Sequence, residues 1–186
     1  MKSIVINYSI VREVDKEKIH EILNGCKSNK YKVYLNLYDF SLTKKIKNYV
    51  DDISDDSIKI SVYERDYEDS EKFVQMITDD IIKYSDSIAY AALNDSIVLN
   101  DNSLDSIDFD IFKNDIYGFL YFDYSINGIR CFVKSRMEKL VMPVIFFSLG
   151  ATIKNISSDN VIETLLKNTI GLHIPKSLCI IYPDNE

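Results

Sequence analysis

Residues 31–50, YKVYLNLYDFSLTKKIKNYV, decide how this chain is expected to fold. Apolar and polar side chains alternate over residues 31–39, which are rich in aromatic and β-branched residues, and this pattern predicts a strand. Ser41 is a residue type that caps helices, and the apolar residues after it, such as Leu42 and Ile46, recur at helical spacing. A strand followed directly by a helix is the repeating unit of a parallel α/β sheet.

The same order recurs on both sides of this stretch. Strands are predicted near residues 4–11, 31–39, 58–63 and 87–93, and helices at residues 15–26, 41–53 and 70–84. Such alternation predicts right-handed βαβ units, a mainly parallel sheet and helices on both of its faces.

The pattern changes after Leu104. Strand-like runs on either side of Asn127-Gly128, a dipeptide typical of tight turns, predict a β-hairpin across residues 116–135. An amphipathic helix at residues 158–170 and a last strand at residues 177–182 follow. The expected architecture is therefore one α/β domain over residues 1–186, Rossmann-like, with an antiparallel hairpin extension.

Composition and charge exclude several classes of protein. Of the 186 residues, 46% are hydrophobic and 27% charged, and the formal net charge of −7 argues against a nucleic-acid-binding surface. No apolar run approaches the roughly 18 residues of a membrane span, and the chain does not begin with the apolar segment of a signal peptide. The 3 cysteines are far apart, which predicts neither a zinc site nor a disulfide framework. We therefore expect a cytoplasmic protein without a membrane span.

Polar side chains stand at the predicted carboxyl ends of two strands. Asp39 ends the second strand, and Asn94, Asp95 and Ser96 follow the fourth. Open α/β sheets bind their ligands at this edge, so these residues are candidates for a shared site. Asp, Asn and Ser are also the usual turn formers, and the spacing leaves that simpler role open.

Charged residues in the second half give two further candidates. Arg130, Lys134, Arg136 and Lys139 form a basic cluster in an acidic chain. The cluster suits a diphosphate, although a solvated strand face that pairs with surplus carboxylates is the alternative. Asp159, at the start of a predicted helix, is either an N-cap or a catalytic base.

In this order of elements the chain resembles the nucleotide-sugar-dependent glycosyltransferases of the GT-A fold, in particular the family 2 group. The resemblance extends over nearly the whole chain and is carried by the stretches SIVINYSI, VYLNLYDFSLTKKIKNYV, SIAYAALNDSIVLNDNSLDSI, IYGFLYFDYSINGIRCFVKS and SSDNVIETLLKNTIGLHIPKSLCIIY. It implies that Asn7 and Tyr8 lie near the nucleotide, with Tyr8 able to stack on the base. It places Asp39 where the family has the acidic residue that contacts the base, and Asp159 where it has the catalytic base.

The chain departs from the family at the metal-binding DxD motif. The matching triplet is Asn94-Asp95-Ser96, in which neutral groups replace the two outer carboxylates. Divalent cations depend on carboxylate charge, so we expect no tightly bound cofactor and only a weakly held Mg²⁺ or Mn²⁺ accompanying the donor. Arg130 and Lys134 would then meet the diphosphate charge.

Two functions remain open at this level. The first is a glycosyltransferase that binds a nucleoside diphosphate sugar and transfers the sugar to a hydroxyl acceptor. The second is a catalytically inactive GT-A-like module that binds a ligand or a partner within an assembly. A flavodoxin-like or regulatory α/β domain, favoured only by the first half of the chain, is a third reading.

Overall fold

A computed structural model gives the structure of the protein. It describes residues 1–41, 43–51, 56, 58–64, 79, 83–84, 86–112, 118–131, 145–148 and 170–182. The helices predicted at residues 70–84 and 158–170 lie almost wholly outside these ranges, as do Lys134, Arg136, Lys139 and Asp159. None of the helices inside them is long and apolar enough to cross a membrane.

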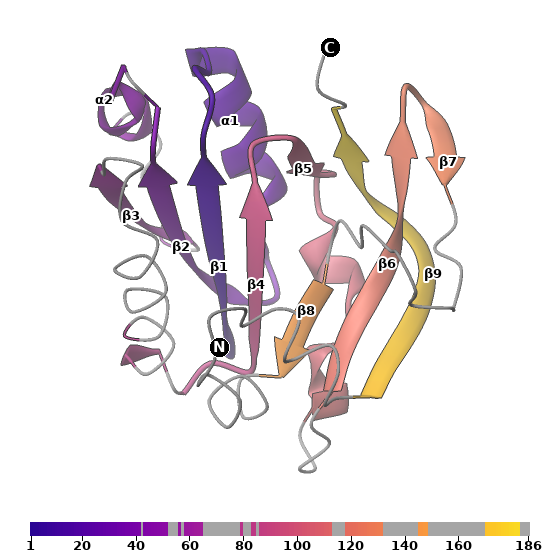
Figure 1. Ribbon diagram of the computed structural model, residues 1–186. Helices are drawn as coiled ribbons and strands as arrows, with labels where there is room; N and C mark the ends of the chain where they lie inside the picture. The colour runs from indigo at the N-terminus through magenta and orange to yellow at the C-terminus, as the bar shows by residue number, and fades with distance from the viewer. Residues whose placement is uncertain are drawn as a thin grey trace.

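The first half of the chain forms the predicted parallel sheet (Figure 1). Its strands are β1 (Ser3–Ile10), β2 (Lys32–Asp39), β3 (Ile58–Glu64) and β4 (Ala89–Asn94), which pair in parallel in the order β3-β2-β1-β4. Each strand falls within three residues of its predicted position, because alternating apolar side chains are buried on the sheet as their spacing requires. The prediction of a parallel sheet is confirmed for these four strands.

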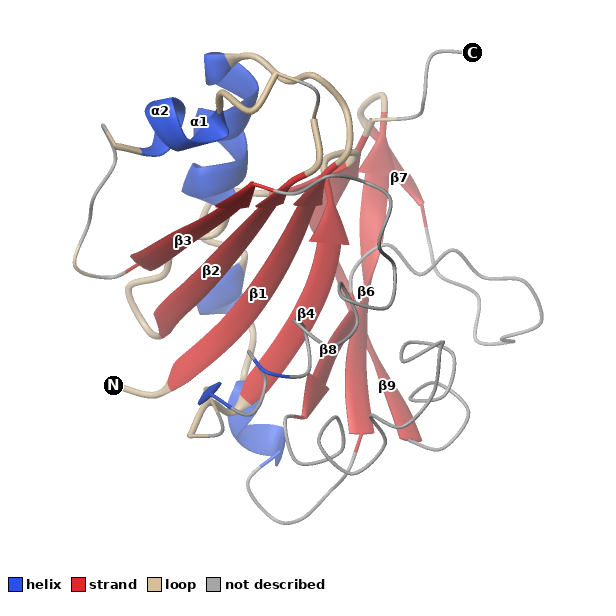
Figure 2. Ribbon diagram, turned by 60° about the vertical axis from the view of Figure 1, so that its left-hand side comes forward, coloured by secondary structure: helices blue, strands red, loops and turns tan. Residues whose placement is uncertain are grey.

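Two helices are described beside this sheet. Helix α1 (Lys16–Gly25) starts at Asp15, whose carboxylate accepts a hydrogen bond from the Lys18 amide at 2.8 Å. It packs against one face of β1–β4, and Figure 2 shows it behind these strands. Helix α2 (Ile46–Val50) begins later than predicted, after Lys45, and Ser41 does not cap it.

The second half extends the sheet with strands of mixed direction. These are β5 (Ile97–Leu99), β6 (Gly118–Ile126), β7 (Ile129–Cys131), β8 (Ile145–Ser148) and β9 (Ile170–Ile181); two short 3₁₀ turns, η1 (Leu104–Ser106) and η2 (Phe109–Phe112), follow β5. The predicted β6–β7 hairpin is present in the described residues, and its turn places both Asn127 and Gly128 at positive φ (49° and 77°). Strand β9 begins at Ile170, earlier than predicted, because it pairs with β6 along its whole length.

Strand β5 joins the two halves of the sheet. It follows β4 after a tight turn, yet it pairs antiparallel with β9 at the far end of the strand order β3-β2-β1-β4-β8-β6-β9-β5. It also lies against α1, where the last helical residue, Gly25, meets the backbone of Leu99. One continuous sheet therefore curves around a shared core.

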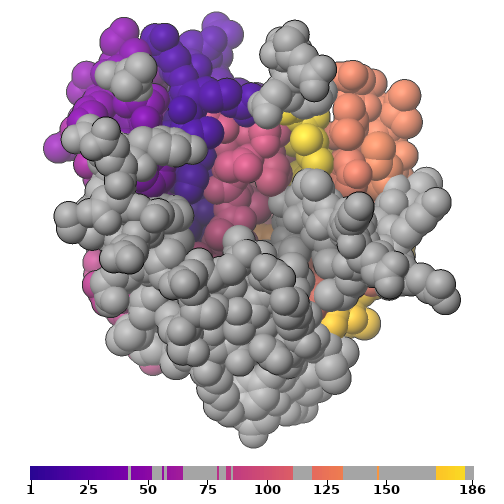
Figure 3. All heavy atoms as spheres, in the orientation of Figure 1, coloured from indigo at the N-terminus to yellow at the C-terminus, as the bar shows by residue number. Residues whose placement is uncertain are grey.

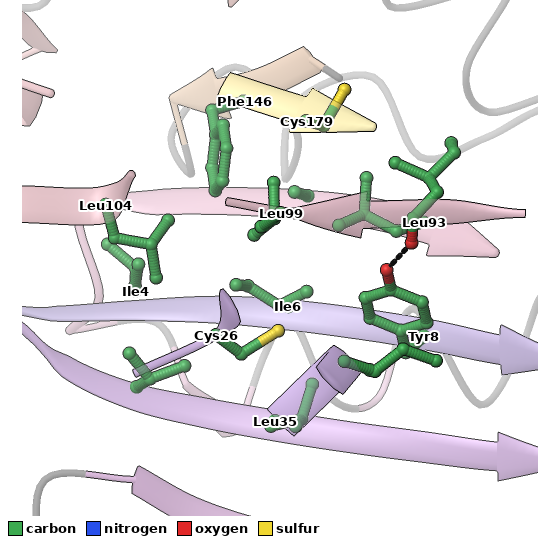
Figure 4. Packing of buried hydrophobic residues seen from close by; sticks show 14 of the residues in the cluster. Ile4, Ile6, Tyr8, Cys26, Leu35, Leu93, Leu99, Leu104, Phe146 and Cys179 are labelled. Atoms are coloured by element: carbon green, nitrogen blue, oxygen red, sulfur yellow. Dashed lines mark hydrogen bonds between the residues drawn. The ribbon is translucent and has the colours of Figure 1, made fainter. Parts of the chain in front are cut away.

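The two faces of the sheet differ in chemistry. The face toward α1 carries the apolar core; Ile4, Ile6, Tyr8, Leu35, Leu93, Leu99, Phe146 and Cys179 are among its residues (Figure 4). The opposite face, called the polar face below, carries Asn36, Asn7 and Tyr90 side by side on β2, β1 and β4. The Asn36 amide donates to the Asn7 side-chain oxygen at 2.9 Å, and the Asn7 amide donates to the Tyr90 hydroxyl at 3.4 Å.

Candidate functional site

Two buried carboxylates lie at the carboxyl edge of the parallel sheet. Asp39 ends β2 and Asp95 follows β4, on either side of β1. The backbone ties both to the end of β1: the amide after Asp39 donates to Ile10, at 2.8 Å, and the Asp95 amide donates to Ser9, at 3.1 Å. Two strand spacings separate β2 from β4, or about 10 Å, which is within the length of one nucleotide.

Asp95 holds the loop between β1 and α1. Its Oδ2 accepts hydrogen bonds from the amides of Val11 and Arg12, at 3.1 and 2.9 Å, and its Oδ1 accepts one from the Arg12 guanidinium at 3.2 Å. The carboxylate is only 3% exposed. Asp95 thus fixes the path of the chain past the strand edge and orients the Arg12 side chain.

Asn94 and Ser96 serve the turn between β4 and β5. The side-chain oxygen of Asn94 accepts hydrogen bonds from the backbone amide and the hydroxyl of Ser96. This is the local bonding that makes Asn and Ser turn formers. The Asn94 oxygen and both Asp95 oxygens therefore already have hydrogen-bond partners within the fold. No group of three or more His, Cys, Asp or Glu side chains that could hold a metal occurs among the described residues.

Asp39 has an unused acceptor atom. Its Oδ1 accepts hydrogen bonds from the amide and the hydroxyl of Ser41, two residues along the chain. Its Oδ2 is buried and receives no hydrogen bond from any described residue. A buried carboxylate oxygen without a donor is costly, so this atom is matched to a donor that the described part of the chain does not supply.

Asn7 and Tyr8 lie inside β1, as the predicted strand at residues 4–11 requires, and not beyond its carboxyl end. Tyr8 points into the core, is 0% exposed and donates its hydroxyl proton to the Ile97 carbonyl (Figure 4). Burial raises the pKa of Tyr8 well above its usual value, so it stays protonated. Asn7 is buried on the polar face within its hydrogen-bonded row. Neither side chain is brought to the strand edge, and Tyr8 has no exposed ring face on which a base could stack.

Arg130 is engaged away from Asp39 and Asp95. It stands on β7, and its guanidinium donates to the Asp123 carboxylate at 2.8 Å and to the Pro175 carbonyl at 2.7 Å. Among the residues that the structure describes, Arg12 is a cation that does lie at the parallel edge. Sequence reasoning missed Arg12 because its position depends on Asp95, 83 residues away. The one available signal was that Arg12 follows the first strand in the loop before a capped helix.

A cavity of about 660 Å³ opens beside the Asp95-held loop, on the side of α1. Its lining includes Arg12, Asp15, Lys18, Asp95 and Tyr182. Carboxylates outnumber cations in this lining, and the Tyr182 ring packs beneath the Lys18 ammonium, 3.2 Å from the ring centroid. Such a lining does not suit an anionic ligand.

No protein-family model matches the sequence, and no curated protein matches it either. Solved structures do match. Residues 1–349 of S. aureus TarS superpose with a TM-score of 0.63 at 16% identity, over 97% of this chain and 60% of that chain. The same TarS fragment in complex with UDP-GlcNAc gives a TM-score of 0.64 at 16% identity, and its complex with UDP gives 0.59 at 15%. The match to the UDP-GlcNAc complex covers 100% of this chain, and the match to the UDP complex covers 97% of it. In both cases this chain spans 60% of the length of the TarS fragment.

At such identities the likeness concerns the fold. The order of the parallel strands, the position of α1 and the mixed strands that continue the sheet agree with it. The chain has a GT-A-like α/β fold.

Proposed function

We propose that this chain binds a nucleoside diphosphate sugar at the carboxyl edge of β1, β2 and β4, and transfers the sugar to a hydroxyl group. The observation that carries the proposal is the buried Asp39 Oδ2, which receives no hydrogen bond from the residues that the structure describes. A nucleobase that presents a ring N–H would supply that donor, and the TarS structures with UDP and UDP-GlcNAc support uracil as the base to test.

The loop held by Asp95 would form the other wall of this site. The backbone amides of Val11 and Arg12 already donate hydrogen bonds to Asp95. A positively charged side chain, rather than these amides, would therefore bind the negatively charged diphosphate. Arg12 is the candidate cation, since its guanidinium is oriented by Asp95 and its side chain is 42% exposed. Lys134, which the resemblance implies as a diphosphate contact, lies outside the described residues and remains part of the proposal. The proposal also includes a general base for the acceptor hydroxyl, a role that the resemblance gives to Asp159, which lies outside the described residues as well. No step is assigned to a metal, because the Asn94-Asp95-Ser96 turn carries a single carboxylate and its polar atoms bond within the fold.

A second function, an inactive GT-A-like module, is favoured by that same turn. The polar atoms of the turn stabilise the fold by bonding one another. A protein that does not turn over a substrate would need no further role for them. The two functions differ in whether a nucleotide sugar binds and turns over.

Calorimetry of the full chain with UDP and with UDP-GlcNAc tests the proposal. We expect binding in the presence of EDTA and little gain from Mn²⁺. Replacing Asp39 by Asn should weaken binding of both ligands by about 10- to 100-fold, because a hydrogen bond to a charged acceptor contributes about 1.5–3 kcal/mol. The matched control is Asp105→Asn, which removes another hydrogen-bonded carboxylate at the opposite, amino end of β2 and should leave binding unchanged.

Each outcome separates the functions. If neither UDP nor UDP-GlcNAc binds at millimolar concentration, the inactive module is the better description. If both bind and Asp39→Asn binds as well as wild type, the base does not occupy the Asp39 oxygen. Binding that requires Mn²⁺ would show that a metal site forms despite the turn.

A further inference from the structure

The polar face carries a second group of ionisable side chains, which the proposed donor site does not use. It consists of Asp123 on β6, Arg130 on β7 and His173 on β9, with Tyr121 of β6 beside them. We call these four residues the Asp123 cluster. Their segments are distant in sequence, and β6 brings them together because it pairs with both β7 and β9.

Asp123 is the centre of this cluster. It is 0% exposed, and its two carboxylate oxygens bond separate partners: Arg130 Nη2 at 2.8 Å and His173 Nε2 at 2.8 Å. The pairing between β6 and β9 shifts register on both sides of Asp123. Such irregularities redirect side chains and are frequent beside active sites.

His173 presents one nitrogen to Asp123 and keeps the other available. An ionised carboxylate only accepts hydrogen bonds, so in a neutral imidazole the proton lies on Nε2 and Nδ1 carries a lone pair. Nδ1 makes no hydrogen bond with the described residues, and the side chain is 31% exposed. The Tyr121 ring stacks on the imidazole, with centroids 5.0 Å apart and planes at 15°, which fixes its orientation. A buried carboxylate that orients a partly exposed imidazole is an arrangement suited to general-base catalysis.

The strand directions place this cluster toward the same edge of the sheet as the donor site. Tyr90 on β4 pairs with Phe147 on β8, which in turn pairs with Phe119 on β6. Strands β4 and β6 run in the same direction, so Asn94 and Asp123 both lie toward the same edge of the sheet. The described part of β8 joins the two strands before these residues, and beyond it β4 and β6 move apart (Figure 1).

His173 also stands on the face that Asn94 shares. His173 is adjacent in sequence to Ile174, which packs on the core, so its own side chain lies on the polar face. Figure 3 looks onto this side of the molecule, where atoms of the carboxyl-terminal part of β9 and of the β6–β7 hairpin reach the surface in the upper half, beside the segment that contains β4.

We propose that His173, held by Asp123, accepts the proton of the hydroxyl group to which the sugar is transferred. This inference rests on the proposed function and gives His173 a role that the resemblance gives to Asp159. The hydroxyl O–H bond breaks with its proton passing to Nδ1, and the oxygen forms a bond to the anomeric carbon. The bond from that carbon to the diphosphate oxygen breaks, and the electron pair leaves with the nucleoside diphosphate. Asp123 stabilises the imidazolium until its proton passes to water.

Release of UDP from UDP-GlcNAc by the full chain, with water as the acceptor hydroxyl, tests this role. His173→Gln should lower the rate at least 100-fold, as expected for loss of a general base, while the Kd for UDP-GlcNAc changes less than twofold. The control is His20→Gln. His20 is the other of the chain's 2 histidines, and it lies on α1, outside the Asp123 cluster. His173→Ala should regain activity when imidazole is added to the buffer, which a purely structural histidine would not do.

The outcomes are distinguishable from failure of the proposed function. If UDP-GlcNAc does not bind to the wild-type chain, the proposed function itself fails. If it binds and UDP release is absent, or is unchanged by His173→Gln, the inference is overturned while donor binding stands. Loss of turnover in Asp159→Asn together with full activity in His173→Gln would return the role to Asp159.

Discussion

At Asp39, Asp95 and Asp105 the same side chain has three different surroundings. Asp95 uses both oxygens to hold a loop, and Asp39 uses one and keeps the other without a described donor. Asp105 accepts hydrogen bonds from the Ser28 hydroxyl, from the side chain of Asn29 and from the backbone amides of Asn29 and Lys30. Partial burial acts to raise the pKa of Asp105, but these hydrogen bonds outweigh it and lower the pKa below the usual 3.8.

Asp105 should therefore stabilise the protein in a pH-dependent way. Its pKa is lower in the folded chain, so its contribution is fully present above about pH 4 and is lost as the pH falls through the lowered value. Asp105→Asn should reduce the free energy of unfolding by about 1–2 kcal/mol at pH 7, and the difference from wild type should narrow at pH 3. Urea unfolding at both pH values measures this. The exposed Asp101→Asn should match wild type, and a pH-independent deficit in Asp105→Asn would contradict the explanation.

At the scale of elements, the packing of α1 on β5 explains why the helix ends at a glycine. A Cβ added at Gly25 would lie 2.1 Å from the carbonyl oxygen of Leu99 and 2.9 Å from its carbonyl carbon. The backbones of the two elements meet there, and no flexible side chain is available to move aside. Close approach, rather than backbone conformation, therefore requires the glycine.

Gly25→Ala should therefore destabilise the protein. Helix propensity alone predicts a gain of roughly 0.5–1 kcal/mol for this change, whereas the clash predicts a loss of about 1–3 kcal/mol. The sign of the change decides between them. Asn24→Ala, at the exposed neighbouring position, is the matched control and should be neutral or slightly stabilising. Thermal unfolding of both variants measures the effect, and equal melting temperatures would show that α1 and β5 separate without cost.

At the scale of the whole molecule, the pairing of β5 with β9 makes the parallel half and the mixed half depend on one another. Leu99 pairs with Cys179 and both lie in the same core cluster as Ile4 and Leu35 of the parallel half. Burial raises the pKa of Cys26 and of Cys179 to about 12, which is consistent with two inert thiols inside this core.

The chain should consequently unfold in one transition. Far-ultraviolet circular dichroism and tyrosine fluorescence should give the same midpoint in urea. Leu99→Ala, which removes buried methyl groups where the halves meet, should lower the free energy of unfolding by about 2–5 kcal/mol and shift both signals together. Two separate transitions, or a shift of one signal alone, would indicate halves that fold independently.

The sequence by itself determined the parallel strands, helix α1 and the β6–β7 turn, because each depends on local periodicity or local backbone preference. Asp15 caps the helix it precedes, and Asn127-Gly128 adopts the positive φ values that its turn requires. The side-chain alternation in β1 also predicts the orientation of Tyr8. Tyr8 is two residues after Ile6, so both side chains point to the same face of the sheet, toward the core. The expected edge of the sheet, with Asp39 and Asp95 beside β1, follows from the same local patterns.

Only the tertiary structure decided what those residues contact. Asp95 meets Arg12, Asp123 meets His173, and β9 extends back to Ile170, because strands distant in sequence pair in a particular register. No local pattern specifies such a register, since it is set by the burial of a shared core and by the curvature that brings β5 to β9. Through these contacts Asp95 holds a loop and orients the Arg12 guanidinium, and the buried Asp123 carboxylate holds the His173 imidazole.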